Sequence, residues 1–158
     1  LVYDSLLEAK AKDCRLLLEA PLSVTLNGDE ELIRRAVENV IRNAIRYAPR
    51  GTAVQIELKK VGRIAEISVR DQGPGVPEDA LPRIFDAFYR VDSDRNRSSG
   101  GLGLGLAIAR RAVELHNGRL SARNANPGLL VTIEFPVAVE VPAPAAAKAA
   151  KPTPVSTS

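Results

Sequence analysis

The chain has 158 residues, of which 45% are hydrophobic, and a formal net charge of +3. That length suits one globular domain with its own core, no apolar run reaches the roughly 18 residues of a membrane span, and no signal peptide is recognisable. With one cysteine, Cys14, and one histidine, His116, an internal disulfide and a structural zinc site are excluded. Three Phe, three Tyr and no Trp argue against a nucleic-acid groove.

The C-terminal segment 138–158 differs from the rest of the chain in composition. It is rich in Ala and Pro and has no aromatic residue. Such a segment cannot bury enough apolar surface to offset the entropy of ordering, so we expect a disordered tail. The folded domain is therefore predicted to span residues 1–137.

Apolar periodicity and turn residues predict the elements in chain order. Apolar pairs recur every four residues after Asp29, which predicts a long helix that begins at this N-cap and ends before Pro49. The other predicted elements are a helix at 3–12, short strands at 14–20 and 22–26, a hairpin of 53–60 with 63–71, a short helix near 79–85, a helix that follows the glycines of 98–105 and ends at His116, and a hairpin of 119–125 with 129–136. Because helices and hairpins segregate, we expect an α+β two-layer sandwich.

The stretch "SSGGLGLGLAIARR", residues 98–111, places glycines before a helix. It lacks the Gly-Lys pair of a P-loop and the spacing of a dinucleotide fingerprint. Glycine-rich backbone at a helix N-terminus still favours anions, since free N–H groups and the helix dipole point outward. A plain hinge before a packed helix explains the stretch equally well when it is taken alone.

The stretch "ENVIRNAIRY", residues 38–47, puts Asn39, Asn43, Arg46 and Tyr47 on one stripe of the long helix. Asparagine is a mediocre helix former, so two in register suggest a function. A carboxamide oxygen suits Mg²⁺, which accepts few protein ligands. A solvated polar face would explain one asparagine more simply than it explains all four residues.

Two further stretches lie between the hairpins. In "DQGPGVP", residues 71–77, Asp71 can accept a hydrogen bond from an exocyclic amine, and Gly73 and Gly75 let backbone approach a flat ring; an ordinary turn is the alternative. In "RIFDAFYRV", residues 83–91, Phe85 and Phe88 are expected to pack the base of a loop. The polar residues that follow predict a mobile lid, in which Arg90, Arg95 and Arg97 could meet phosphate.

The order and spacing of these motifs together resemble the N, G1, F and G2 boxes of bacterial sensor histidine kinases, over nearly all of residues 1–137. A finer similarity is to the envelope-stress sensor type. The resemblance implies the Bergerat fold, in which a mixed, mostly antiparallel sheet packs against about three helices, with ATP and Mg²⁺ bound beneath a lid.

The resemblance also implies roles for individual residues. Asn43 would hold Mg²⁺ with Asn39 nearby, Asp71 would bind the adenine amine, and Arg90 would contact phosphate; Asn43 and Arg90 would be the catalytic pair. The remaining implied nucleotide contacts are Arg46 and Tyr47 on the phosphate and ribose side, Gly73 and Gly75 beside the ring, and Gly101, Leu102, Gly103, Leu104 and Gly105 at the lid hinge and helix N-terminus.

The implied reaction is transfer of the γ-phosphoryl group of ATP to a histidine on a separate dimerisation domain, which then serves a response regulator. The expected location is the cytoplasmic side of an inner-membrane sensor, and the piece itself is expected to be monomeric, without nucleic-acid or membrane contact. Two departures stand out. Leu102 replaces a threonine common in relatives, and His116, followed by Asn117-Gly118, is interpreted as a structural helix end rather than the phosphoacceptor.

Three alternatives stay open. A gyrase- or Hsp90-type ATPase clamp, or an anti-sigma serine kinase, would carry a glutamate one turn before the magnesium asparagine to activate water. This chain has Asn39 there, and Glu38 is interpreted as a surface residue. The third alternative is a binding module that has lost catalysis, which Leu102 keeps open.

Overall fold

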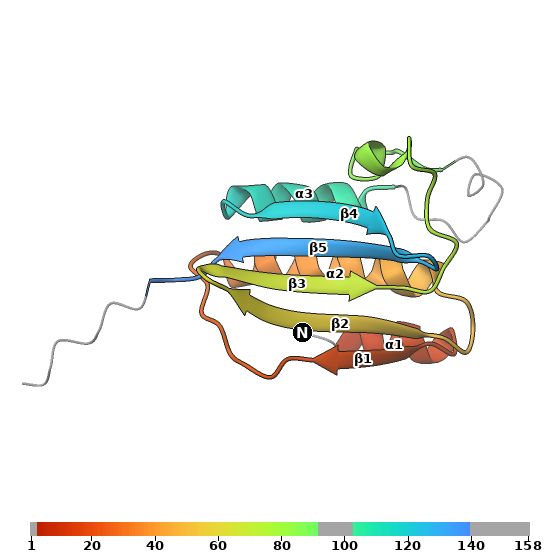
Figure 1. Cartoon of the computed structure of the whole chain (residues 1–158), viewed down its shortest axis with the longest axis horizontal. Coiled ribbons are helices and arrows are strands. Elements are labelled where there is room, and N and C mark those ends of the chain that lie inside the picture. Colours follow the sequence, from red (N-terminus) through yellow and green to blue (C-terminus); the bar gives the residue numbers. More distant parts are fainter. Residues whose placement is uncertain (1–2, 92–102, 140–158) are drawn as a thin grey trace, which may run out of the picture.

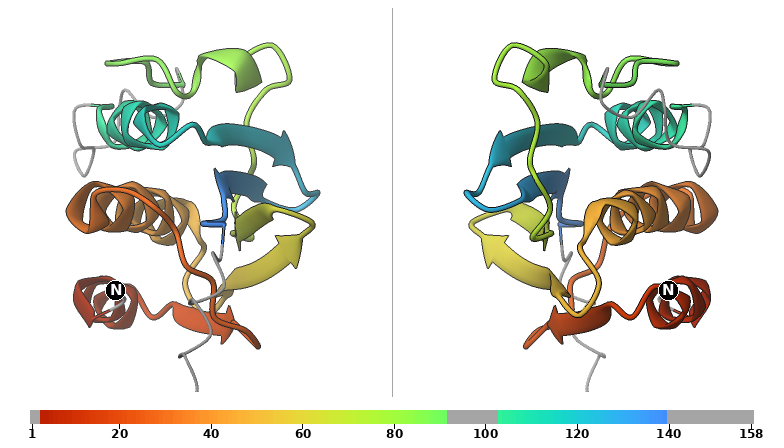
Figure 2. Two further views of the ribbon diagram at one scale, coloured as in Figure 1. Left: turned by 90° about the vertical axis from the view of Figure 1, so that its left-hand side faces the viewer. Right: turned by 90° about the vertical axis from the view of Figure 1, so that its right-hand side faces the viewer.

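The computed structural model describes residues 3–91 and 103–139. Within them, three helices cover one face of a five-stranded sheet (Figures 1 and 2). The predicted α+β sandwich is therefore confirmed. None of the described helices is long and apolar enough to cross a membrane. The elements are α1 (Tyr3–Ala11), β1 (Arg15–Glu19), α2 (Glu30–Tyr47), β2 (Ala53–Val61), β3 (Ile64–Arg70), the 3₁₀ turn η1 (Leu81–Arg83), α3 (Gly105–Leu115), β4 (Arg119–Asn124) and β5 (Leu129–Pro136).

The sheet has the strand order β1-β2-β3-β5-β4. Strands β2 and β3 form the first predicted hairpin and β4 and β5 the second, and β3 also pairs with β5 in antiparallel register. Strand β1 pairs with β2 in parallel. Because parallel neighbours need a crossover, α2 runs across the sheet between β1 and β2, and it lies between α1 and α3 in the helical layer (Figure 2).

Helix α2 forms as its sequence predicts. The Asp29 side chain accepts a hydrogen bond from the Leu32 N–H at 3.0 Å, which caps the helix at the predicted residue. The helix ends at Tyr47, and Ala48, which precedes Pro49, is extended. Its four-residue repeat buries one face against the sheet, through Ala36, Val37, Val40, Ile41, Ala44 and Ile45.

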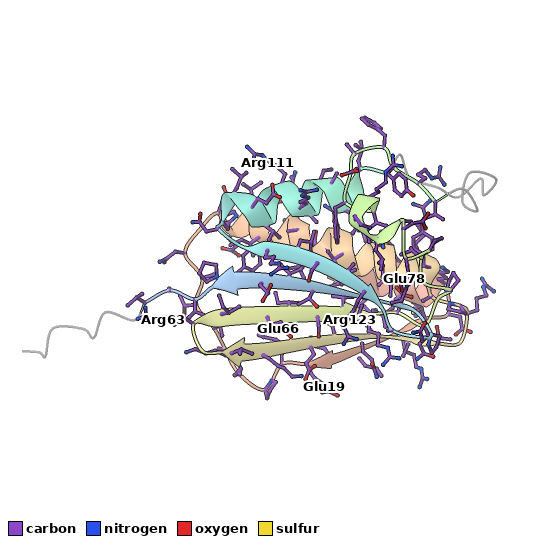
Figure 3. The ribbon with its side chains drawn as sticks, turned by 45° about the horizontal axis from the view of Figure 1, so that its top comes forward. Glu19, Arg63, Glu66, Glu78, Arg111 and Arg123 are labelled. Atoms are coloured by element: carbon purple, nitrogen blue, oxygen red, sulfur yellow. The ribbon has the colours of Figure 1, made fainter. Side chains whose placement is uncertain are left out.

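The sheet face opposite the helices is polar. In β3 the buried Ala65 and Val69 alternate with Glu66, which points to the open face (Figure 3). Arg123 of β4 lies on this face as well. The hydrophobic core therefore lies wholly between the sheet and the helices, with Phe135 and Ile133 of β5 among its most buried side chains.

The predicted strand at 22–26 is wrong. Only Leu26 pairs, in an isolated antiparallel bridge with Val137 just beyond β5. Pro21 has no N–H to donate to a ladder, and the chain turns at Gly28 to start α2, so the run finds no partner strand.

The predicted helix near 79–85 is reduced to the single turn η1, in which Pro82 supplies no donor to extend the helix. Phe85 is buried, as expected for a residue that packs a loop base. Phe88 does not join it: its φ is +64° and its side chain is 70% exposed. The expectation that Phe88 packs inward is wrong. A continued helix would place Phe88 on the same face as Phe85, but the helical turn ends at Arg83.

His116 links the ends of two helices. It is the C-cap of α3; its Nε2 accepts a hydrogen bond from the Asp29 N–H at 3.0 Å, and its Nδ1 lies 2.6 Å from the Ala112 carbonyl oxygen. A neutral ring with its hydrogen on Nδ1 satisfies both contacts. These contacts support the structural interpretation of His116. The predicted tail lies outside the described residues from residue 140 onward.

Candidate functional site

A cavity of about 760 Å³ opens between α2, the loop after β3 and the start of α3. Segments far apart in the sequence meet there, as the family resemblance implies. The predicted site residues that line it are Asn39, Asn43, Arg46, Tyr47, Asp71, Gly75, Arg90, Gly103, Leu104 and Gly105. Gly73 does not line the cavity and instead lies behind Asp71. Gly101 and Leu102 lie outside the described residues.

Helix α2 supplies the polar wall. Asn39 and Asn43 are half-buried on the stripe that faces the cavity, and Asn39 Oδ1 lies against Gly105 at the start of α3. One turn further along, the Arg46 guanidinium carbon lies 5.7 Å from the centroid of the Tyr47 ring. The wall therefore presents carboxamides near α3 and a cation beside an aromatic ring near the helix end.

Lys12, which follows α1, holds the C-terminal end of this wall. Its Nζ donates a hydrogen bond to the Ile45 carbonyl at 2.9 Å and another to the Arg46 carbonyl. Carbonyls in the last turn of a helix lack intrahelical partners, and a cation there also complements the helix dipole. Lys12 therefore fixes the backbone from which Arg46 and Tyr47 project.

Asp71 is the buried charge of the site, with 2% of its surface exposed. Burial raises the pKa of its carboxyl, and hydrogen bonds from the Gly73 and Leu129 N–H groups partly oppose this rise. Within the described part of the chain both bonds end on Oδ1, at 2.7 and 3.3 Å. The other carboxylate oxygen can therefore accept a hydrogen bond from a ligand in the cavity.

Gly128 makes room for Asp71, a role that the sequence does not indicate, since there it only lies between the two predicted strands 119–125 and 129–136. Its φ is +93°, and a Cβ atom at this position would lie 1.8 Å from the Asp71 carbonyl oxygen. Only glycine fits so close to another backbone segment. The signal was available as the Pro127-Gly128 pair, but nothing local indicated that it meets a residue 57 positions earlier in the chain.

The third wall joins the Phe-containing segment to the glycines before α3. The Phe88 N–H donates to the Gly103 carbonyl at 3.0 Å. Gly103 has a φ of +75°, and a Cβ there would approach the Tyr89 carbonyl oxygen to 2.9 Å. Arg83 stacks over the Tyr89 ring at 4.6 Å. These contacts place Arg90 at the cavity wall.

Two charged residues that the sequence did not indicate also line the cavity. Glu8 of α1 and Arg42 of α2 form an ion pair, with Arg42 Nε 3.2 Å from Glu8 Oε1. Glu38, in contrast, is not among the lining residues; it pairs with Arg34 at 3.2 Å, and its side chain is only 13% exposed. Glu38 is therefore a partly buried residue beside Arg34, outside the cavity.

The arrangement suits a ligand with a flat polar ring and a polyanionic tail. Arg42, Arg46 and Arg90 bring positive charge to one cavity, and the glycine-led N-terminus of α3 faces it. The buried Asp71 acceptor sits beside backbone that can approach a ring. Nucleoside phosphates combine these two chemistries.

Comparison with known proteins shows the family to which the chain belongs. The family model described as histidine kinase-, DNA gyrase B- and HSP90-like ATPase matches residues 28–139. The chain belongs to this family, and it carries the ATP-binding fold of the sensor histidine kinases.

Individual relatives are more specific. The chain is 36% identical over 128 residues to the signal transduction histidine-protein kinase BaeS of Escherichia coli K12, covering 80% of this chain and 27% of that protein. It is 42% identical over 125 residues to the sensor protein PfeS of Pseudomonas aeruginosa, covering 79% and 26%. The chain thus spans about a quarter of the length of these relatives.

Solved structures give the same class. The mycobacterial sensor histidine kinase MprB superposes with a TM-score of 0.74 at 33% identity, covering 86% of this chain and 93% of that one. Full-length ShkA, solved in complex with AMPPNP, superposes with a TM-score of 0.69 at 31% identity, covering 83% and 27%.

Proposed function

We propose that this chain binds Mg-ATP in the cavity beside α2 and donates its γ-phosphoryl group to a histidine on a separate domain, as the catalytic part of a two-component sensor kinase. The observation that carries the proposal is the convergence of Asn43, Asp71, Arg90 and the start of α3 on one cavity. The named relatives are sensor kinases, and the neighbour ShkA was solved with an ATP analogue.

Asp71 would recognise the base. Its free carboxylate oxygen would accept the exocyclic amine of adenine, while Gly73 and Leu129 hold the other oxygen. Guanine carries a carbonyl where adenine carries this amine, so two acceptors would then face each other. The site would therefore select ATP over GTP.

The residues present fit a magnesium ion that is bound mainly through the nucleotide. Asn43 offers a carboxamide oxygen at the cavity wall, with Asn39 one turn away. Among the described residues, no group of three or more His, Cys, Asp or Glu side chains could form a self-sufficient metal site. Mg²⁺ keeps several waters and takes few protein ligands when phosphates supply the rest. The ion would supply positive charge beside the transferring phosphoryl group.

Arg46, Arg90 and the backbone before α3 would position the triphosphate. Phosphoryl transfer asks the protein mainly for alignment and charge neutralisation, and an arginine offers fixed donors to phosphate oxygens. Asn39, in the position where a water-activating glutamate would serve hydrolysis, cannot accept a proton at neutral pH. This favours transfer to another domain over an ATPase clamp. The partner histidine domain, the response regulator, and attachment to a membrane sensor are part of this proposal.

Calorimetric titration of ATP into the 158-residue chain, with and without Mg²⁺, tests the proposal. We expect saturable heat and no sustained heat flow, since the histidine acceptor belongs to another domain. Sustained heat flow would mean hydrolysis and would favour the clamp. The absence of binding would contradict the proposed function.

A further inference from the structure

Glu8 is a carboxylate on the wall of a site proposed to bind a polyanion. It projects from α1, whereas the other charged lining residues come from α2 and the loops. A carboxylate repels phosphate at close range unless a cation neutralises it. Arg42 provides that cation, through the ion pair between its Nε and Glu8 Oε1 at 3.2 Å.

The Arg42 guanidinium is only partly engaged by this pair. Within the described part of the chain, its contact is the one through Nε, so the two terminal nitrogens are available to a ligand. Arg42 precedes Asn43 and lies one turn before Arg46 on α2, and all three line the cavity. An arginine in this position can reach a phosphate oxygen with the paired donors that phosphate geometry favours.

The Glu8–Arg42 pair is also weak enough to exchange. The two side chains are 49% and 43% exposed, and an ion pair this exposed is weak because water screens it. A contact between arginine and a phosphate that carries more than one negative charge is the stronger of the two. The bound nucleotide would therefore displace Glu8 as the partner of Arg42.

We propose that Arg42 is a further phosphate-binding residue of this site and that Glu8 is its competing counter-ion. The triphosphate of the nucleotide and the Glu8 carboxylate of α1 then compete for the same guanidinium. The inference rests on the proposed function. Because coupling between two ligands of one group is reciprocal, a bound nucleotide loosens α1 from α2, and a loosened α1 improves nucleotide binding.

Titration of ATP into the full chain and its Glu8→Gln, Arg42→Gln and doubly substituted variants tests this exchange. We expect Glu8→Gln to tighten ATP binding about two- to fivefold, the equivalent of an exposed ion pair. The gain should vanish when Arg42→Gln is also present. Adenosine, which has no phosphate, should bind all four proteins equally.

Glu114→Gln is the matched control, since Glu114 pairs with Arg110 on α3 and lies outside the cavity lining. It removes the same charge and should leave ATP affinity unchanged. In hydrogen exchange, ATP should speed the exchange of α1 amides in the wild type but not in Glu8→Gln.

Two results would overturn the inference while leaving the proposed function intact. One is an unchanged ATP affinity in Glu8→Gln. The other is a gain that persists in the Arg42→Gln background, which would mean that Glu8 acts on phosphate through its field alone. If the wild type binds no ATP, the proposed function fails and this inference fails with it.

Discussion

Asn124 binds both backbone polar groups of Val76. Its Oδ1 accepts the Val76 N–H at 2.9 Å and its Nδ2 donates to the Val76 carbonyl at 2.7 Å, as a neighbouring strand would. The same Nδ2 lies 3.0 Å from Glu78 Oε1 (Glu78 is labelled in Figure 3). One side chain at the end of β4 thus fixes the loop that carries Asp71 and Gly75 to the cavity.

Asn124→Asp should release this loop. Aspartate keeps the acceptor but loses the donor, and it places a carboxylate against the Val76 carbonyl and Glu78. We expect a loss of about 1–3 kcal/mol in the free energy of unfolding and weaker ATP binding. Urea unfolding and calorimetry measure the two effects. Asn27→Asp, at an exposed position, is the matched control; equal behaviour of the two variants would contradict the proposed clamp.

Asp71→Asn should separate binding from folding. The asparagine oxygen can still accept from Gly73 and Leu129, but its NH₂ group then faces the cavity and meets the adenine amine donor to donor. We expect ATP affinity to fall about 10- to 100-fold, the cost of a lost charged hydrogen bond, without loss of thermal stability. An unchanged ATP affinity in this variant would contradict the role of Asp71 in adenine recognition.

The raised pKa of Asp71 predicts how acid acts on the protein. Since the folded-state pKa lies above the unfolded-state value, ionisation of Asp71 costs stability as the pH rises through that interval, and protonation below it removes the cost. ATP and adenosine binding depend on pH with the opposite sign, because protonation of Asp71 places a hydrogen on the oxygen that would otherwise accept from the ligand, while Oδ1 accepts from Gly73 and Leu129. Adenosine affinity should therefore weaken as the pH falls, with a midpoint above the ordinary value of 3.8. Adenosine is the suitable ligand because it has no phosphate to titrate.

Asn39→Glu would place a base one turn before Asn43. If the absence of that base is what prevents hydrolysis, phosphate release from ATP should rise above that of the wild type, and Asn39→Gln, which has the same length without a proton acceptor, should not change it. A colorimetric phosphate assay measures both variants. Unchanged turnover in the glutamate variant would count against the distinction between kinase and clamp drawn from Asn39.

His116→Ala should destabilise the fold without changing ATP binding. The substitution leaves the Asp29 N–H and the Ala112 carbonyl without their partner, so we expect a loss of about 1–3 kcal/mol in the free energy of unfolding. The affinity for ATP should be unchanged, since His116 is not among the cavity-lining residues. A phosphorylated His116 after incubation with labelled ATP would contradict its structural role.

Local patterns predicted those parts of the fold that depend on neighbours in sequence. The repeat and cap of α2 follow from Asp29 and the apolar pairs, and each hairpin follows from strands joined by a short turn. The run at 22–26 has the same strand-like composition but no partner edge, and composition does not reveal pairing. The prediction that Phe88 packs inward assumed a helix that continues past Phe85, whereas the helical turn η1 ends at Arg83.

The residues of the candidate site also differ in whether local sequence or long-range packing determines their role. Residues with a distinctive chemistry and spacing, such as Asn43 and Asp71, were predicted and do line the cavity. Asn124 and Gly128 act on the loop of Asp71 across 48 or more positions, so their role depends on the register of β4 and β5. Arg42 is a common surface residue by its type, and only the packing of α1 on α2 brings it to Glu8.

The crossover position of α2 makes the cavity mechanically asymmetric. One wall is a helix joined to strands at both ends, capped at one end by Asp29 and at the other by Lys12, and packed on the core along its length. The opposite wall consists of loop segments without regular secondary structure, held by hydrogen bonds such as those of Asn124 with Val76 and of Phe88 with Gly103. A ligand that alters the shape of this cavity therefore has to move the loop wall, while Asn39 and Asn43 stay in place as the fixed reference.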